Sequence, residues 1–97
     1  MSEPEVENVR LHAVVHGRVQ GVNFRAYTQR EASRYGLSGW VVNRWDDTVE
    51  TVVEGRRAAV EEFERFLWRG SPSAEVDQVD VTYSEATGEF AGFHIRY

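Results

Sequence analysis

Polar and apolar residues alternate over several short stretches of the chain, as they do in strands that bury one face. Residues 10–16 (RLHAVVH) show this alternation most plainly. Two runs rich in β-branched and aromatic residues flank the pair Asp46-Asp47, a combination that predicts a hairpin. The sequence therefore predicts strands over residues 10–16, 37–45, 48–54, 76–83 and 92–97.

Two other segments place their apolar residues at helical spacing. Residues 23–35 end before Gly36 and residues 56–70 end in Gly70, and glycine commonly stops a helix. The element order is β-α-β-β-α-β with a short extra strand at the C-terminus. This order predicts an α+β fold of the ferredoxin-like class, a sandwich with two helices on one face of an antiparallel sheet. Because this scaffold serves many activities, the function has to be inferred from the site.

The composition excludes several classes of protein. A chain of 97 residues, 41% of them hydrophobic, suits one domain with one core, and we assign residues 1–8 to a short polar tail and 9–97 to that domain. The chain has no cysteine, which excludes disulfides, thiolate nucleophiles and cysteine-based metal sites. It has no apolar run of the roughly 20 residues that span a bilayer. Its acidic N-terminus is unlike a signal peptide, so we expect a cytoplasmic protein with no membrane partner.

The charge balance restricts the partners further. A net charge of −5 argues against a nucleic-acid partner, which normally requires a basic face. All 11 basic residues are arginine, so any anion must be bound by guanidinium groups, backbone amides or uncharged side chains. Residues 16–25 (HGRVQGVNFR) stand out in this acidic chain, because they hold two arginines and two glycines but no acidic residue.

Residues 16–25 connect the first predicted strand to the first predicted helix. A helix N-terminus offers unpaired amides and the positive end of the helix dipole. Gly17 and Gly21 allow the backbone to turn several N–H groups toward an oxyanion, and Arg25 in the first helical turn can close over it. The residues alone leave a plain strand–helix turn with a solvated arginine as the alternative. Neither the Walker A motif nor the G-x-G-x-x-G dinucleotide motif is present.

Two segments of the chain resemble the signature pair of the acylphosphatase family. They are GRVQGVNFR (17–25) and GWVVNRWDDTVETVVEG (39–55). The similarity continues through GSPSAEV (70–76) to FHIRY (93–97), so it covers nearly everything after the N-terminal tail. The resemblance implies hydrolysis of the carboxyl–phosphate anhydride of a small acyl phosphate, without metal or organic cofactor.

The resemblance also implies a role for individual residues. Arg25 would bind the phosphate, and Asn43 would position the attacking water. Backbone amides of the intervening loop would complete the phosphate cradle, from Arg18, Val19, Gln20, Gly21 and Val22. Two positions depart from the usual pattern: Val42 stands where a basic residue is common, and Asp47 where the hairpin turn usually has glycine. We expect Asp47 to adopt a positive φ, which aspartate tolerates better than most residues.

The three histidines are expected to have structural roles. His12 and His16 lie four residues apart, which on a strand is about 13 Å and too far for one metal ion. His94 is alone in its segment. No metal ligand is therefore assigned.

Two other functions remain open from the sequence. The same fold forms the N-terminal domain of hydrogenase-maturation carbamoyltransferases, so a module that binds acyl phosphate (carbamoyl phosphate) without hydrolysing it is the main alternative. Those proteins continue into further domains where this chain ends in HIRY, which favours a free-standing enzyme, expected to be a monomer. An RNA-recognition module would need aromatic residues on its central strands, and residues 10–16 and 48–54 contain none.

Overall fold

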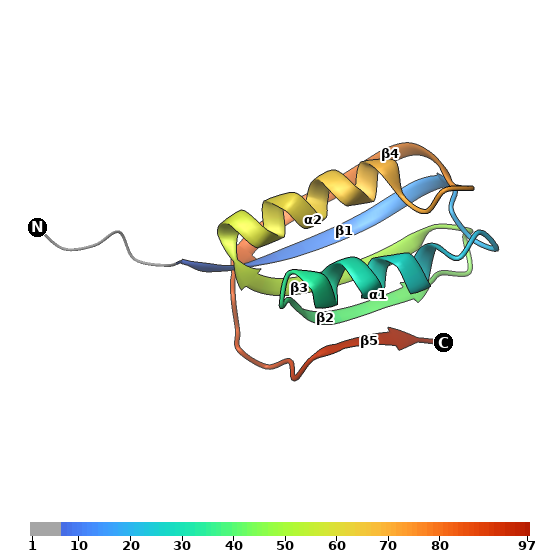
Figure 1. Cartoon of the computed structure of the whole chain (residues 1–97). Coiled ribbons are helices and arrows are strands. Elements are labelled where there is room, and N and C mark those ends of the chain that lie inside the picture. Colours follow the sequence, from blue (N-terminus) through green and yellow to red (C-terminus); the bar gives the residue numbers. More distant parts are fainter. Residues whose placement is uncertain (1–6) are drawn as a thin grey trace, which may run out of the picture.

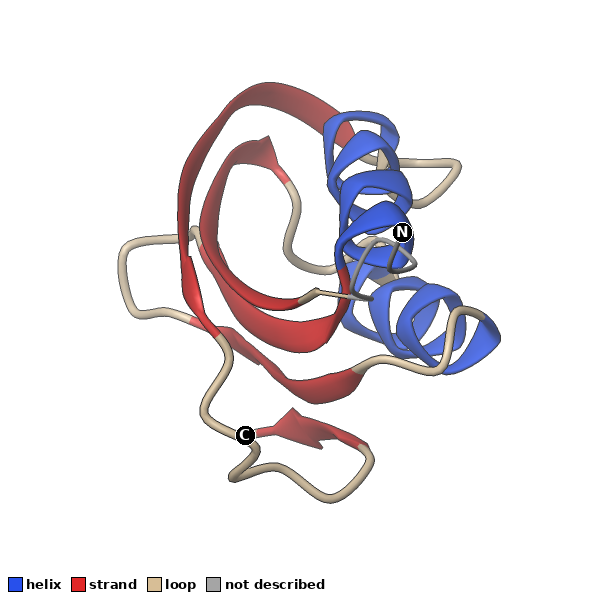
Figure 2. Ribbon diagram, turned by 90° about the vertical axis from the view of Figure 1, so that its left-hand side faces the viewer, coloured by secondary structure: helices blue, strands red, loops and turns tan. Residues whose placement is uncertain are grey.

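The computed structural model of the chain describes residues 7–97 as two helices packed on one face of a sheet (Figures 1 and 2). The strands of this region are β1 (Asn8–Arg18), β2 (Ser38–Asn43), β3 (Val49–Arg56), β4 (Glu75–Glu85) and β5 (Phe93–Arg96). The helices are α1 (Phe24–Arg34) and α2 (Arg57–Arg69). The predicted element order and the ferredoxin-like α+β class are confirmed. Neither of the two helices is long and apolar enough to cross a membrane.

The sheet has the strand order β4-β1-β3-β2-β5. Its first four strands pair antiparallel, as predicted, whereas β5 pairs parallel with β2, so the complete sheet is mixed. The direction of β5 follows from where β4 ends. Glu85, the last residue of β4, pairs with Val9 near the start of β1, and Val9 pairs with Gly55 near the end of β3. Ser38, the first residue of β2, pairs with Glu54, which is next to Gly55. The end of β4 and the start of β2 therefore lie at the same end of the sheet. A chain that leaves β4 at this end, crosses to the far edge and returns must run in the same direction as β2 (Figure 1).

The core between sheet and helices also positions the first turn of α1. The ring of Phe24, the first residue of α1, is 2% exposed and lies 6.1 Å from the ring of Phe66 on α2. Phe63 of α2 in turn packs against Phe93 of β5, with ring centroids 6.3 Å apart. Full burial of such a side chain contributes about 1.5–3 kcal/mol. The position of Arg25, the residue after Phe24, is therefore tied to the core.

The bounds of every element differ from the predictions by one or two residues, and two of these differences concern the loop before α1 and the N-terminal tail. The helix predicted from residue 23 begins at Phe24, because Asn23 takes the N-cap position with φ 63° and makes no side-chain cap. Asparagine adopts this left-handed conformation more readily than most residues. Residues 1–6 of the predicted tail, which spans residues 1–8, lie outside the described residues. Asn8, its last residue, begins β1 and pairs with Arg56.

A buried carboxylate holds the segment that crosses from β4 to β5. Glu54 on β3 is 5% exposed, and its carboxylate accepts hydrogen bonds from the amides of Thr87 at 3.0 Å and Gly88 at 2.9 Å. Arg10 on β1 adds an ion pair at 3.2 Å. Burial opposes the ionisation of Glu54, but the hydrogen bonds and Arg10 outweigh it and hold the pKa of the carboxyl below its usual value. This clasp helps to place β5 at the edge of the sheet.

Candidate active site

Both glycines of the loop between β1 and α1 have positive φ, but for different reasons. Gly17, with φ 127°, lies at a shift in the register between β1 and β4, and a Cβ there would collide with the carbonyl oxygen of Glu75. Gly21, with φ 72°, has open space around it, so only its backbone conformation favours glycine. The first glycine therefore brings two strands together, and the second shapes the tip of the loop.

The two signature segments meet at a pocket of about 280 Å³. It opens where the loop, the first turn of α1, the end of β2 and the C-terminal strand come together, and its lining includes Val19, Gly21, Arg25, Asn43, Ile95 and Tyr97. Arg25 and Asn43, the two residues assigned to the chemistry, thus share one pocket. Arg18, Gln20 and Val22 belong to the same loop but do not line it.

Arg25 is held by the C-terminal strand. Its Nη1 donates a hydrogen bond to the carbonyl oxygen of Arg96 at 3.0 Å, and its guanidinium carbon lies 4.7 Å from the ring centroid of Tyr97. Among residues 7–97 it has no carboxylate partner, so its charge is not neutralised within this region. A guanidinium braced through one nitrogen keeps its other N–H groups for an anion in the pocket.

Asn43 ends β2 with a side-chain oxygen that lacks a partner. Its Oδ1 is buried, and it is the one buried side-chain polar atom of the described region with no hydrogen bond. Buried polar atoms are nearly always paired, and an unpaired one costs about 1–3 kcal/mol. An acceptor left open in a pocket beside a guanidinium is suited to a donor from outside the protein, such as a water molecule.

The side chain of Gln20 links the two signature segments, which the sequence did not reveal. Its Nε2 donates to the carbonyl oxygens of Arg44 at 2.7 Å and Thr48 at 2.9 Å, both in the β2–β3 turn. The prediction used only the backbone amide of Gln20. Since Asn43 precedes Arg44, these bonds fix the loop relative to Asn43.

A second contact holds the loop from the opposite side. Ser71, which is 2% exposed and follows α2, donates its Oγ hydrogen bond to the carbonyl oxygen of Val22 at 2.6 Å. Arg18 points to the same connection, where its Nη2 donates to the carbonyl oxygen of Ser73 at 3.3 Å. No pattern in the sequence indicated the role of Ser71, because its partner is 49 residues away.

Comparison with known proteins identifies the family of the chain. The acylphosphatase family model matches residues 11–95. The chain belongs to the acylphosphatase family. An acylphosphatase of Pelotomaculum thermopropionicum is 48% identical over 92 residues, which cover 95% of this chain and 100% of that one. The crystal structure of acylphosphatase from Bacillus subtilis, 39% identical, superposes with a TM-score of 0.89 and covers 92% of this chain and 99% of that one.

A larger protein contains the same fold. The chain also matches full-length HypF, solved in a phosphate- and nucleotide-bound form, with a TM-score of 0.80 and 30% identity. That match covers 92% of this chain but 12% of the HypF chain. By family and fold, this chain is a hydrolase of the acylphosphatase family with a ferredoxin-like α+β structure.

The position that departs from the family's usual turn glycine has the predicted backbone conformation. Asp47 has φ 71°, in the left-handed region. The neighbouring Asp46 stabilises the turn, since its carboxylate accepts hydrogen bonds from the amide of Thr48 at 3.2 Å and its hydroxyl at 2.6 Å. The hydroxyl bond is the main reason that the pKa of Asp46 lies below its usual value. Val42, the other departure, is half-buried on β2.

Each histidine contacts a protein group. On the sheet, the Nε2 atom of His12 lies 2.7 Å from the carboxylate of Glu50, and that of His16 lies 2.8 Å from Asp80. The Nε2 atom of His94 lies 2.7 Å from the carbonyl oxygen of Ala91. These contacts support the structural roles predicted for the three residues.

Proposed function

We propose that the chain hydrolyses small acyl phosphates to a carboxylate and inorganic phosphate, with Arg25 and the loop 18–22 holding the phosphate and Asn43 positioning the attacking water. The observation that carries this proposal is the unpaired, buried Oδ1 of Asn43 in the same pocket as Arg25. Family membership supports the substrate class, because the relatives are named acylphosphatases.

The reaction suits a site built from one guanidinium and backbone amides. Water attacks phosphorus, the bond from phosphorus to the acyl oxygen breaks, and the carboxylate leaves with the electron pair. The conjugate acid of this leaving group has a pKa of about 4, like a side-chain carboxyl, so no general acid is needed. Arg25 and the loop amides would stabilise the charge on the phosphoryl oxygens as it redistributes.

Asn43 would act on the water and not on the phosphate. Its Oδ1 can accept a hydrogen bond from the water and orient one oxygen lone pair toward phosphorus. An amide oxygen is too weak a base to remove the proton, so the proton would pass to a phosphoryl oxygen of the substrate. In this mechanism neither a metal ion nor an organic cofactor takes part.

Turnover of benzoyl phosphate with and without a chelator tests the proposal. We expect hydrolysis that a chelator does not reduce, together with little action on an ordinary ester such as p-nitrophenyl phosphate. Loss of activity in the chelator would overturn the metal-free mechanism. Comparable rates on the ester would overturn the assignment to acyl phosphates.

The similarity to HypF favours one alternative, a module that binds acyl phosphate without hydrolysing it. Saturable binding of carbamoyl phosphate without release of inorganic phosphate would support that alternative. A cytoplasmic location, a monomeric state and the absence of a nucleic-acid partner remain predictions from the sequence.

A further inference from the structure

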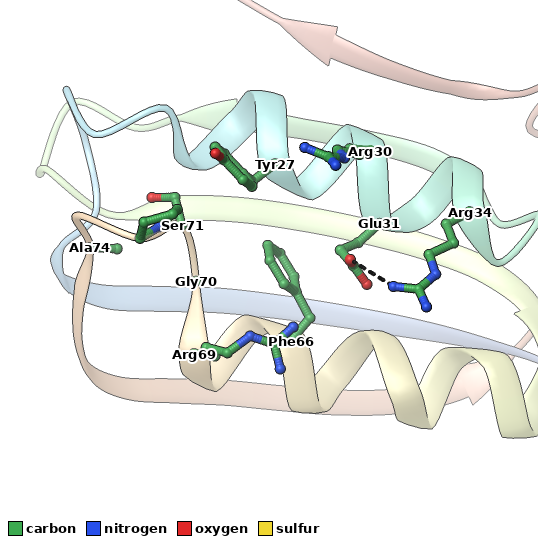
Figure 3. Close-up of a pocket in the computed structure, with 10 residues that line it drawn as sticks. Tyr27, Arg30, Glu31, Arg34, Phe66, Arg69, Gly70, Ser71 and Ala74 are labelled. Carbon is green, nitrogen blue, oxygen red and sulfur yellow. Dashed lines mark ion pairs between the residues drawn. The ribbon is translucent and has the colours of Figure 1, made fainter.

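A second pocket, of about 560 Å³, lies between the two helices and shares no residue with the candidate active site. We call it the inter-helical groove, and Figure 3 shows side chains of both helices around it. Tyr27, Arg30, Glu31 and Arg34 reach it from α1, and Phe66 and Arg69 from α2. Its volume is within the range of small-molecule sites, roughly 300–1,000 Å³.

The groove is positively charged although the protein is acidic. Three arginines, Arg30, Arg34 and Arg69, line it together with one carboxylate, that of Glu31, so the local balance is two positive charges in a chain of net charge −5. The single ion pair between these residues, from Arg34 to Glu31, spans 3.6 Å (Figure 3). The groove therefore attracts an anion with at least two negative charges.

Two of the arginines are free to bind that anion. Within residues 7–97, neither Arg30 nor Arg69 forms an ion pair. Instead their guanidinium groups lie over aromatic rings, Arg30 at 5.8 Å from the centroid of Tyr27 and Arg69 at 5.6 Å from that of Phe66. Contact with a ring face limits the motion of a long side chain but leaves the N–H groups at its edge available.

The charges are spread along the groove and not gathered at one point. Arg30 and Arg34 lie about one helical turn apart on α1, a rise of about 6 Å, and Arg69 comes from the opposite helix. Because arginines on both helices line the groove, a chain of linked phosphates can contact more of them at once than a single phosphate can. The planar fork of arginine also suits phosphate oxygens better than a point charge would.

We propose that the inter-helical groove binds a small polyphosphate, an anion with at least two linked phosphate groups, and that Arg30 and Arg69 hold it directly.

The groove also adjoins two contacts that hold the candidate active site. Ser71 lines the groove and donates to the carbonyl oxygen of Val22, and the ring of Phe66 packs on Phe24, which precedes Arg25. Binding in the groove is therefore expected to change the KM for acyl phosphate at least about fivefold, an expectation that rests on the proposed function.

Calorimetric titration with tripolyphosphate, ATP and inorganic phosphate tests the binding without requiring hydrolysis. The titrations use wild type and Arg25→Gln, in which the active-site pocket has lost its arginine, at low ionic strength with a chelator present. We expect saturable binding of tripolyphosphate to both proteins and much weaker binding of inorganic phosphate. Equal affinity for ATP and tripolyphosphate would show that the groove recognises the phosphate chain alone. Tighter binding of ATP would identify a nucleotide as the polyphosphate ligand.

Paired variants locate the site. In the Arg25→Gln background, Arg30→Gln and Arg69→Gln should each weaken tripolyphosphate binding at least about tenfold, the effect of losing a charge-assisted hydrogen bond. Arg65→Gln is the matched control, because Arg65 pairs with Glu62 on α2 and does not line the groove. Absence of binding to Arg25→Gln, or equal binding by all three variants, would overturn the proposal. An unchanged KM in the presence of bound tripolyphosphate would overturn the coupling alone.

Discussion

Replacement of Asn43 by alanine should separate catalysis from stability. The side-chain oxygen of Asn43 is buried and unpaired within residues 7–97, and such an atom costs about 1–3 kcal/mol. Asn43→Ala removes this cost, while the packing lost with a half-buried side chain offsets part of the gain. We expect the free energy of unfolding to stay equal or rise by up to about 1 kcal/mol, a Tm increase of at most about 4–8 °C for a domain of this size.

The same substitution should nearly abolish turnover. Loss of one preorganised polar group typically lowers kcat by about 10²–10³, or roughly 3–4 kcal/mol in the barrier. Inhibition by inorganic phosphate should remain close to wild type in Asn43→Ala, because Arg25 and the loop 18–22 are intact. Arg25→Gln should instead lose both turnover and phosphate inhibition. Arg25→Lys should fail nearly as badly, since one ammonium cannot reproduce a planar, bidentate fork.

The assay is a kcat and a phosphate inhibition constant for each variant with benzoyl phosphate, beside a thermal melt followed by circular dichroism. Arg65→Gln serves as the control for loss of an arginine outside the pocket. Equal loss of phosphate affinity in Asn43→Ala and Arg25→Gln would make Asn43 a phosphate ligand or a structural residue. A marked fall in the Tm of Asn43→Ala would show that its oxygen is paired in the folded protein.

Three further substitutions test the active-site loop, the β2–β3 turn and the clasp that Glu54 forms with the segment between β4 and β5. Gln20→Ala should lower the free energy of unfolding by about 1–2 kcal/mol through two lost hydrogen bonds, and raise the KM, as urea titration and steady-state kinetics would show. Asp47→Gly should stabilise the fold by at most about 1 kcal/mol, and a lower Tm would contradict the strain inferred from φ 71°. The folded-state pKa of Glu54 lies below its ordinary 4.5, so its ionised form stabilises the protein above that pH, and the contribution is lost as the pH falls through the lower, folded value. Urea unfolding should therefore show wild type and Glu54→Gln converging at acid pH, and a constant difference would refute the clasp.

The elements of the fold could be predicted because their signals are local. Alternation over residues 10–16 and helical spacing over 56–70 depend on near neighbours in the chain, and the structure has β1 and α2 there. The parallel pairing of β5 with β2 depends instead on where β4 ends, which no local pattern encodes. Asp47 stands where the hairpin turn of the family usually has glycine, and this position predicted a positive φ, which the structure confirms.

The site could be predicted only as far as the signature segments reach. They indicated Arg25 and Asn43, whose common pocket joins the two segments, while their catalytic roles remain predictions. The contacts that hold these residues are formed with distant backbone groups. Gln20 reaches Thr48 across 28 residues, and Arg25 reaches Arg96 across 71. A backbone carbonyl has no identity in the sequence, so such partners become visible only in the folded chain.

These long-range contacts have a consequence for how the enzyme folds. The pocket needs the β2–β3 turn, the connection after α2 and strand β5 in place at once, because Gln20, Ser71 and Arg96 each hold part of it. Contacts that close such long loops form late and slowly, so a partly folded chain would hold secondary structure but no anion site. A phosphate ligand would then bind the native state alone and add about 2.7 kcal/mol to its stability at 100 times Kd. Recovery of catalysis during refolding should accordingly lag behind recovery of the circular dichroism signal.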